Sequence, residues 1–231
     1  MKSQRTSTGP LLSLRAGLAD ISAQRWLCLM SGLACFGFGI ALMVQAGLGL
    51  GPWESLNQGI SFHIGLPIGT VSILLGIPIL MLWLPLGERI GIGTALNVVS
   101  IGTATNVSLL FLPRFPQLPL QLMQMALGIL FIGIGSGLYL STRLGAGPRD
   151  GLMMGLSRRT GWSVRATRTA IELTVLAAAW LLGGTIGIGT LAFALGIGPV
   201  VQLVFGLLGM KPVQHPAAPV DLPADAAAVD A

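Results

Sequence analysis

Two acidic residues of this chain stand in nearly identical surroundings, 96 positions apart. Glu54 ends the segment Leu48-Gly49-Leu50-Gly51-Pro52-Trp53-Glu54, and Asp150 ends the segment Leu144-Gly145-Ala146-Gly147-Pro148-Arg149-Asp150. A proline at the first helical position followed by an acid in the first turn is typical of a helix start, where a carboxylate complements the helix dipole. Two such starts, brought together, would form a polar site for a substrate or an ion. Its candidate residues are Gly51, Pro52, Glu54, Gly147, Pro148 and Asp150.

Glu172 is a third candidate for substrate or ion binding, because it is the only carboxylate well inside an apolar run. Acidic residues at membrane depth are costly and usually functional. Arg168 precedes Glu172 by four residues and lies on the same helical face. The alternative is therefore that Arg168 neutralises Glu172 near the cytoplasmic boundary.

Other kinds of chemistry find little support in the sequence. No nucleophile and base pair, metal-binding motif or phosphate-binding loop is present, and His63 and His215 have no partner at ligand spacing. Cys28 and Cys35 would lie about 10 Å apart along a helix, which is too far for a disulfide. We therefore expect no enzyme and no catalytic, metal or cofactor site.

Composition places the chain in the membrane. Hydrophobic residues make up 53% of the sequence and charged residues 9%, and the mean hydropathy is +0.81. A soluble domain has roughly 25% charged residues. The pI of about 10.2 does not indicate nucleic-acid binding, because the arginines flank apolar runs instead of clustering on one solvated face.

Six apolar runs have the roughly 17 to 25 residues that a membrane-spanning helix needs. They cover Trp26 to Gly47, Pro67 to Leu86, Ile90 to Leu112, Leu118 to Leu140, Val164 to Leu182 and Ile186 to Leu208. The polar stretch 1–25 lacks the features of a signal peptide and is expected to be a cytoplasmic leader, with a short interfacial helix at Leu11 to Ile21. The Ala- and Pro-rich stretch 211–231 is expected to be a disordered cytoplasmic tail.

The offset of 96 residues extends well beyond the two motifs. It relates Ile90-Gly91-Ile92-Gly93-Thr94 to an identical copy at 186–190, and glycines of the first apolar run to glycines of the fourth. The sequence therefore predicts two repeats, 26–114 and 115–210. Each contains three spans, with a short helix started by Gly and Pro between the first and second. Three is an odd number, so the second repeat must enter the membrane from the opposite side. The predicted fold is an all-α polytopic membrane protein of six transmembrane helices in two inverted repeats.

The positions of the basic residues agree with inversion. If the leader is cytoplasmic, all 13 Lys and Arg residues except Arg114 lie on the cytoplasmic side, as the positive-inside rule requires. Five uncharged residues of repeat 1 also have arginines as their counterparts in repeat 2, at positions 149, 158, 159, 165 and 168. We expect a multi-pass protein of the bacterial plasma membrane with both termini in the cytoplasm.

Two hypotheses remain for the short helices that follow the motifs. In the first they lie at the membrane interface, with Trp53 as an anchor and Arg158 and Arg159 near lipid phosphates. In the second both re-enter the membrane, and their amino termini meet near its centre to form the polar site.

Glycines and polar residues inside the runs are expected to serve packing. The glycines let helix backbones approach closely, and Asn97, Thr103, Thr105, Asn106 and Gln202 are expected to bond to neighbouring helices. These glycines are Gly91, Gly93, Gly102, Gly187, Gly189 and Gly198. Glycine-rich faces are also compatible with a homodimer.

The motifs carry a family resemblance. Gly49 to Glu54, the connection Leu84-Pro85-Leu86-Gly87-Glu88-Arg89 with Gly91 to Thr94, and Leu144 to Gly151 resemble the YczE-like bacterial integral membrane proteins, which are related to the YitT group. The resemblance runs from about Trp26 to Met210. It implies a bacterial plasma-membrane protein of multiple helices, and it transfers no substrate and no catalytic residue.

Two functions are expected ahead of an enzymatic one. The first is a small transporter or permease for an unknown small molecule or ion, which works by movement of the two inverted repeats around Glu54, Asp150 and Glu172. The second is an accessory or regulatory membrane protein that binds a partner or anionic lipid through an arginine-rich cytoplasmic face, with Arg158, Arg159 and Arg165 as the contacts.

Inversion predicts the location of reporters fused within the two repeats. A reporter fused after Gly59 should be active on the outer side of the membrane, and one fused after Gly155 on the cytoplasmic side. A pair of alkaline phosphatase and fluorescent protein fusions measures both locations, and identical signals at the two sites would contradict inversion.

Overall fold

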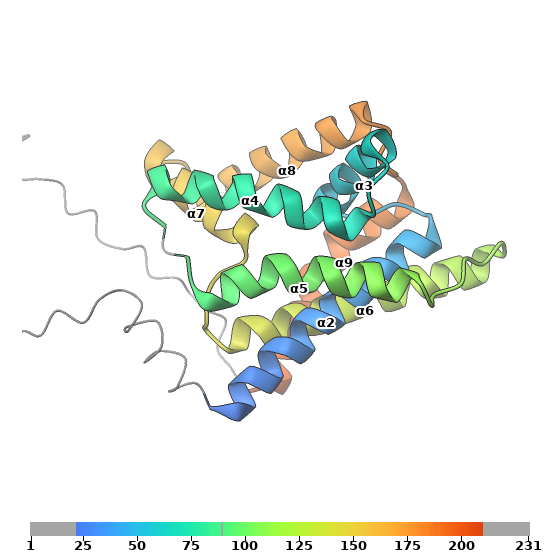
Figure 1. Cartoon of the computed structure of the whole chain (residues 1–231), viewed down its shortest axis with the longest axis horizontal. Coiled ribbons are helices and arrows are strands. Elements are labelled where there is room, and N and C mark those ends of the chain that lie inside the picture. Colours follow the sequence, from blue (N-terminus) through green and yellow to red (C-terminus); the bar gives the residue numbers. More distant parts are fainter. Residues whose placement is uncertain (1–21, 89, 210–231) are drawn as a thin grey trace, which may run out of the picture.

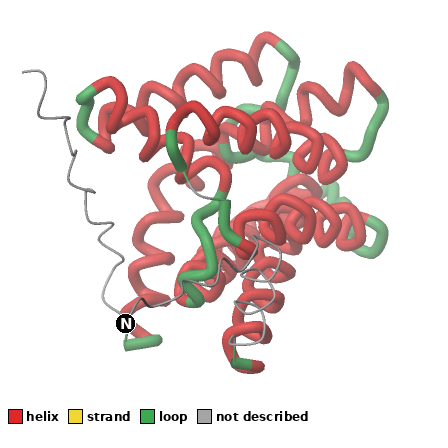
Figure 2. Tube along the Cα trace, turned by 60° about the vertical axis from the view of Figure 1, so that its left-hand side comes forward, coloured by secondary structure: helices red, strands yellow, loops and turns green. Residues whose placement is uncertain are grey.

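The computed structural model describes residues 22–88 and 90–209, and every regular element in these ranges is a helix (Figures 1 and 2). The elements are α2 (Ala23–Ala46), α3 (Pro52–Ile64), α4 (Ile68–Leu86), α5 (Ile92–Leu109), α6 (Leu118–Ser141), α7 (Pro148–Thr160), α8 (Val164–Leu181) and α9 (Ile188–Leu207). The predicted interfacial helix at Leu11 to Ile21 and the tail 211–231 lie outside the described residues.

The helices match the six apolar runs and the two short segments that follow the motifs. By length and composition, four of the described helices are able to cross a membrane, namely α2, α4, α6 and α9. Helix α8 is of similar length but carries Arg165, Arg168 and Glu172, and α5 contains two asparagines and three threonines. The chain is therefore an all-helical, multi-pass membrane protein.

The ends of the short helices follow from sequence. Pro52 and Pro148 occupy the first turn of α3 and α7, as predicted, after extended backbone at Gly51 and Gly147. Each helix has 13 residues and ends at a glycine in the left-handed conformation, Gly65 or Gly161, both with φ of 71°. A side chain would be strained at that φ, so these glycines terminate both helices at equivalent positions.

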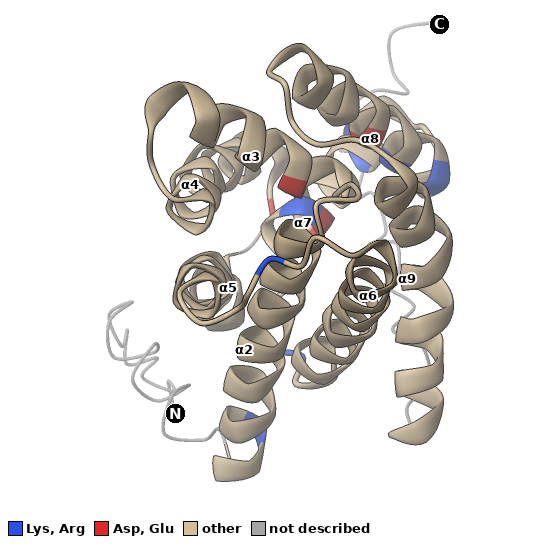
Figure 3. Cartoon of the chain, turned by 90° about the vertical axis from the view of Figure 1, so that its right-hand side faces the viewer, with Lys and Arg blue, Asp and Glu red and all other residues tan. Residues whose placement is uncertain are grey.

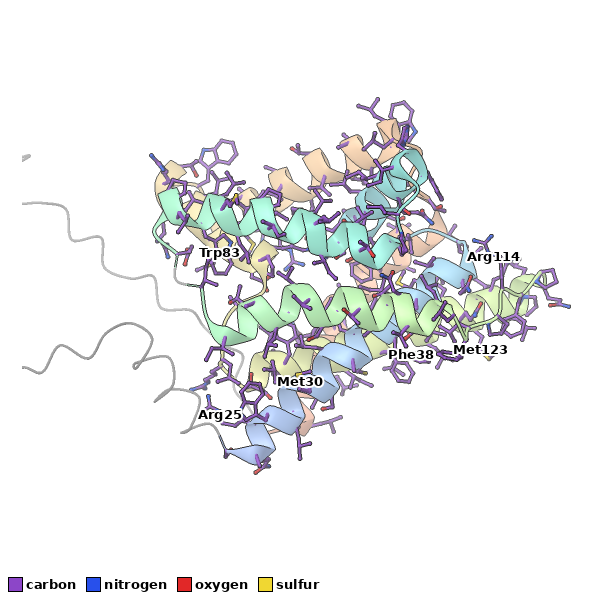
Figure 4. All side chains as sticks on the ribbon, viewed as in Figure 1. Arg25, Met30, Phe38, Trp83, Arg114 and Met123 are labelled. Carbon is purple, nitrogen blue, oxygen red and sulfur yellow. The ribbon has the colours of Figure 1, made fainter. Side chains whose placement is uncertain are left out.

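Helices α2 and α6 pack against each other in opposite directions along the lower side of the molecule in the view of Figure 1. Gly32 lies against Gly135, and Gly39 lies against Gly128, so the backbones touch at two levels. At one end, Arg25 Nη2 donates a hydrogen bond of 2.6 Å to the carbonyl oxygen of Thr142. Figure 4 shows Arg25 at this end and Arg114 at the opposite end of the molecule.

Each motif loop is bonded to the start of the last helix of the other repeat. The backbone N–H of Gly93 donates to Leu144 O at 2.9 Å, and that of Gly189 donates to Leu48 O at 2.8 Å. The two bonds are equivalent in the repeats, because Gly189 is the counterpart of Gly93 and Leu144 is the counterpart of Leu48. Two loop glycines, Gly49 and Gly145, have positive φ. A Cβ at Gly49 would collide with the start of α9, and a Cβ at Gly145 would collide with the start of α5.

The second pair of crossed contacts joins α4 to α7 and α3 to α8. Trp83 on α4 is buried, donates its Nε1–H to Pro148 O at 2.9 Å, and fills the space beside Gly151. Its repeat counterpart on α8 is the much smaller Ala179, which is also buried. On that side the loop after α8 fills the space instead, with Gly184 against the backbone of Ser55.

The two repeats differ in how their last two helices pack. In repeat 1, α4 lies against α5, where a Cβ at Gly69 would be 2.0 Å from Gly102 O. Asn106 joins the same helices by accepting from Gly69 N at 2.9 Å and donating to Thr70 Oγ1 at 3.0 Å. In repeat 2, α8 and α9 lack this close packing.

The packing role predicted for Gly198 is therefore wrong. Gly198 is the counterpart of Gly102, but no atom lies within 4 Å of a Cβ built there. The physical reason is that α8 and α9 do not approach each other as α4 and α5 do, and Arg165 stands where repeat 1 has Gly69. The other five glycines predicted to pack closely do so.

The α2–α6 contact predicts a strong effect of one methyl group. Gly39→Ala should lower the free energy of unfolding by about 2 kcal/mol, because its Cβ would lie 2.7 Å from backbone atoms of Gly128 and Ile132. Unfolding by sodium dodecyl sulfate in mixed micelles measures the change.

The matched control is Gly206→Ala on α9, where nothing lies within 4 Å and stability should stay equal or rise slightly. Equal effects at the two glycines would contradict the packing described.

Candidate functional site

A cavity of about 420 Å³ lies between the two repeats, and all eight described helices contribute to its walls. The first turns of α3 and α7 both reach it, with Pro52, Glu54, Gly147, Pro148 and Asp150 in its lining. The structure thus brings the two predicted helix starts together. Gly51 lies just behind, beside Glu54 and Phe193.

An ion pair joins the two helix starts directly. Arg149 Nη1 lies 2.6 Å from Glu54 Oε1, and the side chain of Glu54 is 6% exposed whereas that of Arg149 is 33% exposed. Charged segments accordingly lie together in the middle of the bundle, near the start of α7 (Figure 3). A charge-assisted hydrogen bond in such surroundings is strong, and removing one partner leaves the other without compensation.

The same guanidinium stacks on an aromatic ring. Arg149 Cζ lies 5.1 Å from the centroid of the Trp53 ring, within the range of a cation–π interaction. Trp53 and Glu54 are consecutive residues of α3, so a single helical turn presents a ring face and a carboxylate to one cation. Trp53 therefore contributes to the cavity, which argues against the hypothesis that it anchors an interfacial helix.

Asp150 receives a hydrogen bond from the chain's single tyrosine. Tyr139 on α6 donates its hydroxyl to Asp150 Oδ2 at 3.3 Å, and both residues line the cavity. Tyr139 is buried beside Phe36, in the cluster that joins α2 to α6. The carboxylate of α7 is thus positioned by the pair of helices α2 and α6.

Glu172 reaches the cavity from α8 together with Arg168. Arg168 Nε donates to Glu172 Oε1 at 2.9 Å, which confirms the predicted pairing along the helix. Both side chains are more exposed than the Glu54–Arg149 pair.

The cavity reaches the surface between α8 and α9. Of its lining residues, those that are exposed are Arg168 on α8 and Gly198 and Gln202 on α9. Helices α8 and α9 lack the close packing that joins α4 to α5 in repeat 1. The cavity is therefore open where the packing of repeat 2 differs from that of repeat 1.

The three arginines predicted to contact lipid or a partner lie away from the cavity lining. Arg158 forms an ion pair with Glu88, and Arg159 donates to Pro85 O at 3.0 Å, so both hold α7 to the end of α4. Arg165 is exposed at the start of α8.

Several residues that line the cavity were absent from the predicted site. Trp53 was expected to be an interfacial anchor, Arg149 was recognised only as a difference between the repeats, and Tyr139 was not considered. Their position between the motif proline and acid was a usable signal for Trp53 and Arg149. Asn97 and Gln202 line the cavity, while Thr105 and Asn106 form the helix contacts that were predicted. The prediction for Thr103 is wrong, because its hydroxyl bonds to Val99 O of its own helix.

The described residues contain no group of three His, Cys, Asp or Glu side chains that could hold a metal ion. The polar side chains that line the cavity include carboxylates, guanidiniums, amides and hydroxyls. Such groups bind and orient a solute by charge and hydrogen bonds.

The family model described as "Family of unknown function (DUF6198)" matches residues 23–205. The chain belongs to this family. It is 38% identical over 184 residues to an "Uncharacterized protein" of Haemophilus influenzae, which covers 80% of this chain and 84% of that protein. It is 37% identical over 181 residues to the "Uncharacterized membrane protein YczE" of Bacillus subtilis, covering 77% of this chain and 84% of that protein.

A further relative, the "Uncharacterized protein YyaS" of Bacillus subtilis, is 32% identical over 168 residues, 69% of this chain and 82% of that protein. No solved structure matches the chain. The resemblance to YczE-like membrane proteins is thus confirmed, and the family region contains all eight described helices up to residue 205.

The ion pair between the repeats predicts unequal effects of two substitutions. Arg149→Gln should lower the free energy of unfolding by about 3 kcal/mol, because it leaves the buried Glu54 without its cation. Glu54→Gln should cost less, about 1 to 2 kcal/mol, because the guanidinium it leaves is one-third exposed. The double variant should be more stable than the sum of the single effects predicts. Unfolding in mixed micelles measures all three.

The corresponding control is the more exposed pair Arg158 and Glu88, where each single substitution should cost at most about 1 kcal/mol. Additive effects at Glu54 and Arg149 would contradict a direct interaction.

Proposed function

We propose that this chain is a small transporter of the bacterial plasma membrane, in which two inverted repeats alternate around the central cavity. The observation that carries the proposal is the meeting of the two motif helix starts in one cavity, joined by Arg149 and Glu54. Transporters with inverted repeats bind their substrates at such a meeting of interrupted helices, between the halves.

Inversion is supported by the contacts between equivalent helices. Helices α2 and α6 are repeat counterparts and run antiparallel, and the bonds of Leu48 and Leu144 are exchanged by the repeat offset. Helices α5 and α8 have 18 residues each, enough for about 27 Å. Their polar side chains Asn97, Arg168 and Glu172 face the cavity, where a spanning helix tolerates them.

Burial supports re-entry of the short helices over an interfacial position. Glu54 is 4% exposed, and the backbone of both motif loops is bonded to the opposite repeat. Irregular backbone is tolerated at membrane depth only where protein or a cavity surrounds it. The predicted cytoplasmic location of both termini follows from the basic residues, and Arg25 and Arg114 lie at opposite ends of the molecule (Figure 4).

The unequal packing of the repeats supports an alternating mechanism. In this conformation the cavity is closed between α4 and α5 and open between α8 and α9. If the two repeats exchanged these arrangements, α8 and α9 would close against each other and α4 and α5 would separate. The cavity would then open between α4 and α5.

The accessory or regulatory function remains the second candidate. It depends on an arginine-rich cytoplasmic face, and Arg165 is exposed and available for anionic lipid or a partner. Arg158 and Arg159 support it less, since their side chains already bind the end of α4.

Paired cysteines test the alternating mechanism. In a background with Cys28 and Cys35 replaced by alanine, Thr70→Cys with Asn106→Cys should cross-link readily, because these side chains are 3.0 Å apart between α4 and α5. The equivalent pair, Ala166→Cys with Gln202→Cys, should cross-link slowly and only as α8 and α9 close. Cross-linking either pair should abolish solute uptake, and reduction should restore it.

Uptake is measured by metabolite profiling of membrane vesicles with and without a proton gradient. Unchanged uptake after complete cross-linking of Thr70→Cys with Asn106→Cys, or no solute accumulated by the unmodified protein, would count against transport.

A further inference from the structure

We propose that the cavity binds a small organic cation, which displaces the Arg149 guanidinium from Glu54 and Trp53. This inference names the ligand class of the proposed transporter. Only the transport of the bound ligand rests on the proposed function.

The site for a cation already exists in the first turn of α3. Glu54 and Trp53 hold the Arg149 guanidinium with a contact of 2.6 Å to the carboxylate and 5.1 Å from its central carbon to the ring centroid. A carboxylate beside an aromatic face is the arrangement that recognises ammonium and guanidinium groups. Here the bound cation is a side chain of the opposite repeat.

The charged groups of the cavity differ in how they are held. Arg168 and Glu172 pair with each other on α8 and are the more exposed pair. Asp150 accepts a hydrogen bond from Tyr139. The buried carboxylate of Glu54 is therefore the group that a positive ligand would bind in place of Arg149.

When a cation displaces Arg149, the charged group that loses its partner is the more exposed member of the ion pair. A cation bound to Glu54 releases Arg149, whose side chain is one-third exposed and able to reach solvent in the cavity. An anion bound to Arg149 would release Glu54, whose side chain is 6% exposed. A buried charge without a partner is costly, so the exchange favours a cation over an anion as the ligand.

The remaining walls suit an apolar body attached to the cation. Phe36, Phe193 and Phe205 line the cavity beside aliphatic residues. The volume of about 420 Å³ lies within the range of small-molecule sites. The ligand class is therefore an amine with an aromatic or aliphatic substituent.

Displacement links binding to movement of the repeats. The Arg149–Glu54 pair is the ion pair that joins α3 to α7 across the cavity. A ligand that takes the place of Arg149 removes this connection between the halves while it is bound.

Three probes of similar shape test the charge preference. Binding of benzylammonium, benzoate and benzyl alcohol to the full chain in lipid nanodiscs is measured by calorimetry. Benzylammonium should bind, and benzoate should not. Glu54→Gln should weaken benzylammonium binding at least about tenfold. Trp53→Leu should weaken it about threefold to tenfold, with most of the affinity retained in Trp53→Phe.

Arg149→Gln gives the sharpest result. Because it removes the internal competitor, it should strengthen benzylammonium binding about tenfold, whereas a site built for anions would lose its ligand. Arg158→Gln, outside the cavity, should leave binding unchanged. Thermal denaturation of each variant establishes that it is folded, and Trp53→Phe and Trp53→Leu test the site without a change of charge.

Several results would overturn the inference. These are benzoate binding that Arg149→Gln abolishes, benzylammonium binding that Glu54→Gln and Trp53→Leu do not alter, or no binding of benzylammonium up to about 10 mM. Uptake of labelled benzylamine and benzoate into proteoliposomes separates the two proposals. Benzylamine binding without uptake retains the cation site and removes transport, whereas uptake of benzoate alone retains transport and removes the cation site.

Discussion

The structure depends on satisfying the backbone of two loops that interrupt its helices. A buried backbone N–H or carbonyl without a partner is costly, so an irregular loop inside the helix bundle must be bonded to other parts of the protein. Leu48 O and Leu144 O accept from Gly189 N and Gly93 N, each in the other repeat. Neither repeat is complete alone, and this mutual dependence fixes where both short helices begin. The position of Glu54 and Asp150 follows from it.

Charge is then placed where that framework leaves space. The two helix starts would present similar carboxylates to each other if the repeats were identical. Arg149 in the position of Trp53 converts this repulsion into an ion pair and a stacking contact across the cavity. Repeat 2 carries further arginines on α7 and α8. Of these, Arg158 pairs with Glu88 at the end of α4, and Arg168 pairs with Glu172. At the helix starts, the two repeats therefore share their backbone geometry and differ in charge.

Local features of the fold could be predicted from the sequence, and contacts between distant residues could not. Apolar length and the Gly-Pro pattern identified the helices and the starts at Pro52 and Pro148, because these depend on neighbouring residues. The i to i+4 pair of Arg168 and Glu172 was predictable for the same reason. The contact of Arg149 with Glu54 joins residues 95 positions apart and needs the relative placement of two helices. Gly198 was misjudged because its packing depends on how closely α8 and α9 approach each other, which is a property of the tertiary arrangement.

Trp83 and Gly151 show how far the two repeats have become specialised for each other. The indole occupies the volume that a side chain at 151 would need, and the equivalent positions on the other side hold Ala179 and Ser55. Two copies of the first repeat would press a tryptophan against a serine, and two copies of the second would leave an empty space beside an alanine. A pair of identical half-length chains would therefore lose this matched contact on both sides of the molecule.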